Sequence, residues 1–263
     1  MSAAEFATIA DPLDYLTEST YLFRGFSQGW LGDYLSPDDL VSETYFPNRP
    51  IYTAFEPDRV LSVLYLLVAG GPVIIRSSPL DRIIGITYPG ACFGMRNLPF
   101  SHGVIKFAFP SPVEAYKRTH VLKVPEASLQ RLYKASSEFQ QRYDLLFELR
   151  EKFEYHLLNC SSYPPQAVAA LLRALVYQER SLGAQPNAEG VYEFDLPIDI
   201  ISRACHLNRR TVEQVLKGMA QVGLIQTTSQ TSEGSDTVQV LDPESLKGIY
   251  AATREKVDWW PLR

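Results

Sequence analysis

Polar side chains with the chemistry to contact nucleic acid gather in the stretch RACHLNRRTVEQVLK, residues 203–217. The stretch holds four Lys or Arg residues and one acid, a net charge of +3. The whole chain carries −5, so the remainder carries −8. Arg suits bidentate contact with guanine, and Asn and Gln suit adenine. We expect the residues that bind DNA to be Arg203, Asn208, Arg209, Arg210, Thr211, Gln214 and Lys217.

The residues around this stretch predict a helix-turn-helix. Asp195 is placed to cap a first helix that has Pro197 in its first turn. Its apolar face is expected to contain Ile198, Ile201 and Ala204, followed by Leu207 in the turn. In such a unit the second helix enters the major groove with its N-terminal residues near base edges.

Asn208 is a good N-cap for the second helix. Helical spacing places Val212, Val215, Leu216 and Met219 on its inward face, and turns outward Arg209, Arg210, Glu213, Gln214 and Lys217. Arg209 and Arg210 oppose the helix macrodipole in the first turn, a cost that a phosphate or a guanine edge would compensate. A solvated helix face in a protein-interaction module is the alternative.

A hairpin is predicted after this helix, with strands at Gln226–Thr231 and Thr237–Leu241. A hairpin in this position is a wing, and wings commonly contact the phosphate backbone. This one carries Glu233 and Asp236 but no Lys or Arg, so we expect it to be a weak phosphate anchor.

Bulk composition excludes several classes of protein. Hydrophobic residues make up 46% and charged residues 21%, which is typical of a globular chain. The three cysteines, Cys92, Cys160 and Cys205, are too far apart in sequence to form a metal motif, and they fit a reduced, cytoplasmic setting. The N-terminus lacks a secretory signal, and the run VLSVLYLLVAGGPVII is too short to span a bilayer. We therefore expect no membrane association.

Residues from about 20 to 125 read as all-β, with strands in YLLVA, PVIIRS, RIIGITY, GVIKFAF and HVLKV. The turn Gly70-Gly71-Pro72 separates the first two. Many short strands with turn signals predict a sandwich, jelly roll or barrel.

One long helix is predicted from Glu126 to about Leu158, because no Pro or Gly interrupts it. It carries a seam of coiled-coil spacing. The seam could pack on its own domain or pair with a second copy, and we favour the dimer. Arg150 then needs a carboxylate or a bound anion. The expected dimer residues are Phe139, Tyr143, Leu146, Arg150, Phe153 and Leu157.

Pro164-Pro165 cannot continue a helix interior but can open a new helix. We therefore expect three parts: a β-domain at 1–125, a dimerisation helix at 126–160 and a DNA-binding domain at 161–263.

This order of elements resembles the Crp-Fnr superfamily of bacterial transcription regulators, over roughly residues 22–250. The matching segments are VLYLLVAGGPVIIRSS, YPGACFG and LPIDIISRACHLNRRTVEQVLKGMAQVGLIQ. The resemblance implies an α+β fold with an N-terminal double-stranded β-roll (jelly-roll-like), a long dimerisation helix and a C-terminal winged helix-turn-helix. It also implies a homodimer on an inverted repeat of double-stranded DNA, with RNA polymerase as a further partner.

Matched by position, Arg209 stands where the family has its base-reading Arg. Arg210 stands where Glu is common, and Gln214 where Arg is common, so we expect an altered base preference. His206 occupies a turn position often held by Gly, and His tolerates a left-handed conformation better than most residues.

The ligand cassette departs from the members that bind cyclic AMP. Met95 replaces the Glu that holds the ribose, and Phe109-Pro110 replaces the Arg-Ser or Arg-Thr pair that neutralises the cyclic phosphate. A buried phosphate needs a charge partner. We therefore predict no ordinary binding of cyclic AMP or cyclic GMP.

AFPSPVEA is more similar to the cassette of the nitrogen-control regulator NtcA, which senses 2-oxoglutarate. A small anionic effector would then be held by residues drawn from Gly94, Met95, Arg96, His102, Lys106, Arg142 and Arg150. An effector-independent regulator is at least as well supported. We expect no cofactor, because the cysteines of an iron–sulfur sensor are missing and the four histidines are isolated.

Enzymatic functions find no support in the sequence. A metal-binding cupin needs clustered His and Glu ligands, which His102 and His120 do not supply. Cys92 has no obvious His partner for a cysteine hydrolase. A protein-interaction adaptor that kept the fold remains the other alternative: the acidic wing favours it, and Arg209 with Arg210 argues against it.

Overall fold

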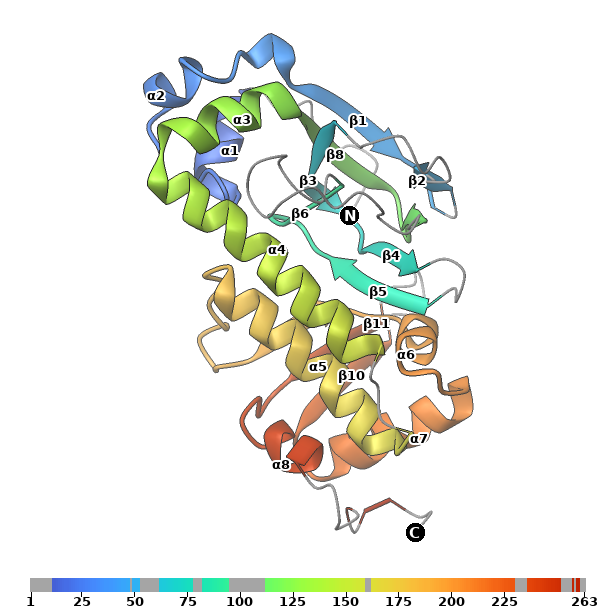
Figure 1. Ribbon diagram of the computed structural model, residues 1–263. Helices are drawn as coiled ribbons and strands as arrows, with labels where there is room; N and C mark the ends of the chain where they lie inside the picture. Colours follow the sequence, from blue (N-terminus) through green and yellow to red (C-terminus); the bar gives the residue numbers. More distant parts are fainter. Residues whose placement is uncertain are drawn as a thin grey trace. The chain divides into compact units, whose positions relative to one another are not determined.

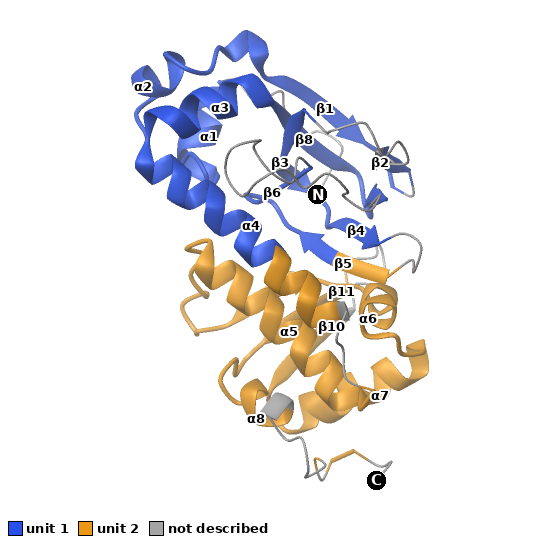
Figure 2. Ribbon diagram, in the orientation of Figure 1, with its two compact units in different colours: residues 1–81, 85–150 blue, residues 82–84, 151–263 orange. Residues whose placement is uncertain are grey.

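We analysed a computed structural model of the chain (Figure 1). The structure describes residues 11–47, 49–52, 62–77, 82–94, 112–158, 162–229, 236–251, 257 and 259–260. The chain divides into two compact units, residues 1–81 with 85–150, and residues 82–84 with 151–263 (Figure 2). Each unit is described by itself below.

Two four-stranded sheets form the β-roll. One has the order β1-β8-β3-β6, and its three pairings are antiparallel; the strands are Val41–Tyr45, Thr119–Pro125, Val63–Gly70 and Cys92–Gly94. The other has the order β2-β7-β4-β5, with strands Pro50–Tyr52, Val113–Ala115, Val73–Ser77 and Arg82–Thr87. The expected turn at Gly70-Gly71-Pro72 joins β3 to β4. The expected strand GVIKFAF lies outside the described residues.

An N-terminal helical segment precedes the roll, where an all-β chain was expected from about residue 20. It contains α1 (Pro12–Ser19), α2 (Gln28–Gly32) and the short 3-10 helix η1 (Pro37–Asp39). Its apolar side chains join those of the later helices in one core, which includes Leu16, Phe23, Leu31, Leu129 and Leu132. The segment is therefore an integral layer of this unit.

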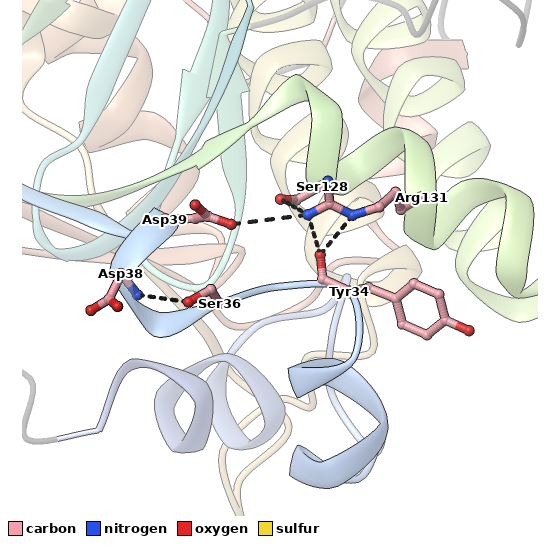
Figure 3. A network of polar contacts seen from close by, with 6 residues as sticks. All are labelled: Tyr34, Ser36, Asp38, Asp39, Ser128 and Arg131. Atoms are coloured by element: carbon pink, nitrogen blue, oxygen red, sulfur yellow. Dashed lines mark hydrogen bonds and ion pairs between the residues drawn. The ribbon is translucent and has the colours of Figure 1, made fainter.

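Arginine 131 ties this segment to α3 (Glu126–Ala135). Its guanidinium donates twice to the backbone carbonyl of Tyr34, at 3.2 and 2.7 Å, and once to Ser128 Oγ at 3.0 Å. Asp39 lies 3.9 Å away. Figure 3 shows the guanidinium directed at the Tyr34 carbonyl, with the Tyr34 ring turned away from it.

The single helix expected over 126–158 is wrong, because the structure has two. Between α3 and α4 (Ser137–Leu158), Ser136 adopts an extended conformation with φ −135° and ψ 120°. Its Oγ accepts a hydrogen bond from the N–H of Phe139 at 3.1 Å. Ser136 thus ends one helix and caps the next, a role that serine fills well.

The C-terminal unit follows the predicted order of elements. Its helices are α5 (Pro164–Ser181), α6 (Ile198–Cys205), α7 (Arg209–Gln221) and α8 (Leu246–Ala251). Its antiparallel sheet has the order β10-β11-β9, with strands Ile225–Ser229, Asp236–Val240 and Tyr192–Asp195. Over the described parts of the chain, no helix is long and apolar enough to cross a membrane.

Candidate nucleic-acid interface

The first helix of the helix-turn-helix begins later than expected. Asp195 is not its cap, because it is the last residue of β9 and pairs with Thr237 in β11. Pro197 occupies the N-cap position and supplies no side-chain hydrogen bond. The predicted inward residues Ile201 and Ala204 are fully buried, as is Ile200, whereas Ile198 is only half-buried.

The turn after α6 adopts the expected left-handed geometry. His206 has φ 55° and ψ 36°, and its N–H donates to the carbonyl of Ser202. The N–H of Leu207 donates to the same carbonyl at 3.0 Å. These bonds satisfy the end of α6 and reverse the chain into α7.

Asn208 caps α7, as predicted. Its Oδ1 accepts hydrogen bonds from the backbone N–H of Thr211 at 2.8 Å and from Thr211 Oγ1 at 3.0 Å. Asn208 and Thr211, two of the residues that we expected to bind DNA, therefore also stabilise the start of the helix.

The two faces of α7 are as predicted. The inward side chains are buried: Val212, Val215 and Met219 are 0% exposed, and Leu216 is 5% exposed. The outward side chains are all exposed: Arg209, Arg210, Glu213, Gln214 and Lys217. Arg203 lies on the last turn of α6 and is half-buried. The candidate reading face therefore consists chiefly of α7 residues.

An ion pair crosses this reading face. Arg209 Nε donates to Glu213 Oε1 at 3.0 Å, and the two side chains are 70% and 48% exposed. Our sequence reasoning missed the pair, although the i,i+4 spacing of opposite charges was a signal for it. The bond engages Nε and not the two terminal nitrogens of the guanidinium, which are donors that can meet a guanine.

The predicted wing is present as a hairpin. Strands β10 and β11 pair from Ile225↔Val240 to Ser229↔Asp236, and β9 extends the sheet beside β11. The tip, which includes the expected acid Glu233, lies outside the described residues.

Two of the expected effector residues meet in the β-roll unit. Arg150 Nη1 lies 3.4 Å from the carbonyl oxygen of Gly94 and donates to it. Gly94 has φ 108°, and an added Cβ would lie 2.7 Å from the Tyr65 ring, so glycine is required there. Burial raises the pKa of the neighbouring Cys92 thiol to about 12, although Arg150 lowers it in part. Met95, Arg96, His102 and Lys106 lie outside the described residues.

Arg142, another expected effector residue, contacts the N-terminal segment. It donates to the carbonyl of Arg24 at 2.5 Å and to that of Tyr21 at 3.4 Å. It also pairs with Glu138 and lies over the Phe26 ring, 5.0 Å from the centroid. These contacts engage its guanidinium within its own unit, and its expected effector role stays a prediction.

The predicted dimer seam is largely covered by its own chain. Phe139 and Tyr143 are 0% exposed, and Phe153 and Leu157 are 4% and 2% exposed. Phe139 contacts the rings of Phe23 and Phe26 from the N-terminal segment at centroid distances of 5.6 and 6.4 Å. Of the six seam residues, only Leu146 and Arg150 are half-buried. Packing on the own domain therefore holds for Phe139 and Tyr143, which belong to the core shared with the N-terminal segment. Homodimerisation itself stays a prediction.

The described residues contain no group of His, Cys, Asp and Glu side chains that could hold a metal ion. The fold they define is a β-roll, a long helix and a winged helix-turn-helix, which is the α+β architecture expected from the sequence.

Solved structures share this architecture. FixK2 from Bradyrhizobium japonicum superimposes with a TM-score of 0.57 at 18% identity, covering 81% of this chain and 98% of its own. A CooA variant from Carboxydothermus hydrogenoformans superimposes with a TM-score of 0.56 at 16% identity, covering 89% of this chain and 97% of its own. Structural neighbours include Crp/Fnr-type transcription regulators. No protein-family model and no curated protein matches the sequence. At these identities the likeness establishes the fold, and it leaves the NtcA-like reading of the cassette unconfirmed.

Proposed function

We propose that the protein is a sequence-specific DNA-binding transcription regulator that acts in the cytoplasm as a homodimer on an inverted repeat. The observation that carries the proposal is the outward face of α7, where Arg209, Arg210, Gln214 and Lys217 are all exposed beside a capped helix start. Such a face matches the hydrogen-bonding edges of the major groove. As a regulator of transcription, the protein would have RNA polymerase as its further partner.

The charge distribution supports base-dependent binding. The net charge of +3 at 203–217 stands against −8 for the rest of the chain. Attraction to phosphates in general is therefore weak, and binding depends on correct base contacts. The four exposed donors on one helix face favour DNA binding over the alternative, an adaptor that does not bind DNA.

Selection from a pool of random duplexes at low salt tests this function. We expect enrichment of an inverted repeat with half-sites about one helical turn apart. Failure to enrich any sequence would refute DNA binding, and enrichment of single half-sites would refute the homodimer.

A second candidate role, sensing of a small polar effector, is supported by Tyr143. Among the described residues, its Oη is buried with no hydrogen-bond partner. Such a group is costly unless something satisfies it. Isothermal calorimetry with 2-oxoglutarate and with cyclic AMP tests this role. We expect no binding of cyclic AMP, and submicromolar affinity for it would overturn the argument from Met95 and Phe109.

A further inference from the structure

The C-terminal tail folds back onto the winged helix-turn-helix. Trp260 is 2% exposed, and its backbone N–H donates to the backbone carbonyl of Val257 at 3.2 Å. The N–H of Val257 donates to Tyr163 Oη at 3.0 Å, and Tyr163 is the N-cap of α5. The rings of Trp259 and Trp260 meet edge to face, 6.3 Å apart. The tail is thus anchored at the start of α5.

Trp259 contacts the last turn of α7 at a glycine. A Cβ added to Gly218 would lie 2.3 Å from Cε3 and 2.6 Å from Cζ3 of the Trp259 ring. Even alanine at this position therefore displaces the ring, because real Cβ contacts are not that short. Glycine inside a helix normally destabilises it relative to alanine. Its presence here is explained by the room that Trp259 needs.

The contact lies beside the candidate reading face. Gly218 is four residues after Gln214, so the two are neighbours on the helix surface. The inner side of α7 packs against α5, α6 and β10. Trp259 adds a further contact at Gly218, next to Gln214 on the helix surface.

We propose that Val257, Trp259 and Trp260 belong to a strap that fixes the position of the recognition helix, with Trp259 as a positioning residue for DNA binding. The strap joins the start of α5 to the last turn of α7 through the Tyr163–Val257 bond and the Trp259–Gly218 contact. A helix already held in place loses less conformational freedom when it binds, so the strap increases affinity without reading a base. The DNA-binding part rests on the proposed function; the packing part does not.

A double-mutant cycle on the full chain tests the packing. Gly218→Ala alone should lower the melting temperature, because the new methyl group displaces Trp259. In the Trp259→Ala background the same Gly218→Ala change should raise the melting temperature, as alanine normally does in a helix. Equal effects in both backgrounds would overturn the strap. If Trp259→Ala does not fold, Trp259→Leu provides the second background.

Affinity for the selected duplex tests the positioning role. We expect Trp259→Ala to weaken binding by about two- to tenfold, the cost of ordering loosened side chains, while the selected motif stays unchanged. Tyr177→Ala, at an exposed aromatic on α5, is the matched control and should leave affinity unaltered. If the melting temperatures show coupling between Gly218 and Trp259 but Trp259→Ala binds the duplex with unchanged affinity, the strap stands and the positioning role of Trp259 is refuted. If no duplex is selected, the proposed function fails, and the melting cycle still decides the strap.

Discussion

In the proposed function, some residues at the start of α7 build the helix and others read DNA. Asn208 and Thr211 satisfy the helix start, and Arg209 is held by Glu213 across one helical turn. Arg210, Gln214 and Lys217 complete the exposed face. The Arg209–Glu213 pair places one acid among the cations that would approach phosphates. In the proposed function, the negative charge of Glu213 lowers affinity for any duplex, and its bond to Arg209 increases selectivity for the correct base.

Replacing Glu213 by Gln should therefore tighten binding to any duplex and reduce discrimination. The change removes a negative charge from the reading face and releases Arg209 from its fixed direction. The ratio of affinities for selected and random duplexes, measured by fluorescence anisotropy, should fall several-fold. Glu189→Gln removes the same charge from an exposed loop and should leave the ratio intact. A ratio that rises in Glu213→Gln would contradict this role.

The cap residue makes a separate prediction about stability. Asn208→Ala leaves the N–H of Thr211 without its acceptor, at a cost of about 1 kcal/mol. Urea unfolding should show this loss, and Asn208→Ser, which can also cap, should restore most of it. Equal stability of the Ala and Ser variants would mean that the cap contributes nothing.

Protonation of a buried histidine gives a pH dependence. His120 Nε2 lies 3.0 Å from Ser42 Oγ and Nδ1 lies 3.1 Å from Thr44 Oγ1; burial, and then Arg118, lower its pKa below 6.5. Because the unfolded chain binds this proton more readily, the stability that neutral His120 provides is present above pH 6.5 and is lost as the pH falls below it.

Urea unfolding at a series of pH values from about 7.5 to 5.5 measures this effect. We expect stability to fall over that range and the fall to be shallower in His120→Gln. Burial also lowers the pKa of His156 and His206, so part of the fall persists. An identical slope in the variant would contradict the assignment to His120.

At the scale of elements, local signals were predictable and tertiary ones were not. The faces of α7, its cap and the hairpin follow from spacing and short-range hydrogen bonds, and the sequence predicted all three. The break at Ser136 was not predictable, because serine is tolerated inside helices and only the tertiary path of the chain makes it a cap. Asp195 was misplaced because a sheet register decided its role.

The sequence patterns did not predict the helices of the N-terminal segment, and this omission affected the interpretation of α4 most. Its helices are short, and Phe23 and Phe26 cover α4 positions whose coiled-coil spacing had suggested a partner helix. The apolar residues of a dimer seam and those of a helix face packed on its own core have nearly the same spacing, so only the structure distinguishes the two.

Arg142→Ala should loosen this segment. Arg142 binds the carbonyls of Tyr21 and Arg24, and hydrogen bonds to charged groups contribute about 1.5–3 kcal/mol; partial exposure places the expected loss at the low end. Hydrogen exchange should rise selectively over residues 12–32. Lys134→Ala, which removes a cation from the exposed end of α3, is the control. Unchanged protection in Arg142→Ala would show that the apolar contacts suffice.

At the scale of the whole molecule, an acidic chain has a local net charge of +3 over residues 203–217. The fold and the order of its elements could be predicted from strand runs, breaks and the helix-turn-helix spacing. What the cassette binds could not, because residues that hold a small ligand are brought together by tertiary structure and not by sequence spacing. The central claim is therefore that Arg209, on the exposed face of α7, reads a base.

The most direct test compares the motifs that the native protein and Arg209→Ala select from the same random duplex pool. The native protein should select an inverted repeat, and Arg209→Ala should lose preference at one base step of each half-site, a change of about 1–3 kcal/mol. The other positions of the motif should be retained. An identical motif from both proteins would contradict the claim that Arg209 reads DNA.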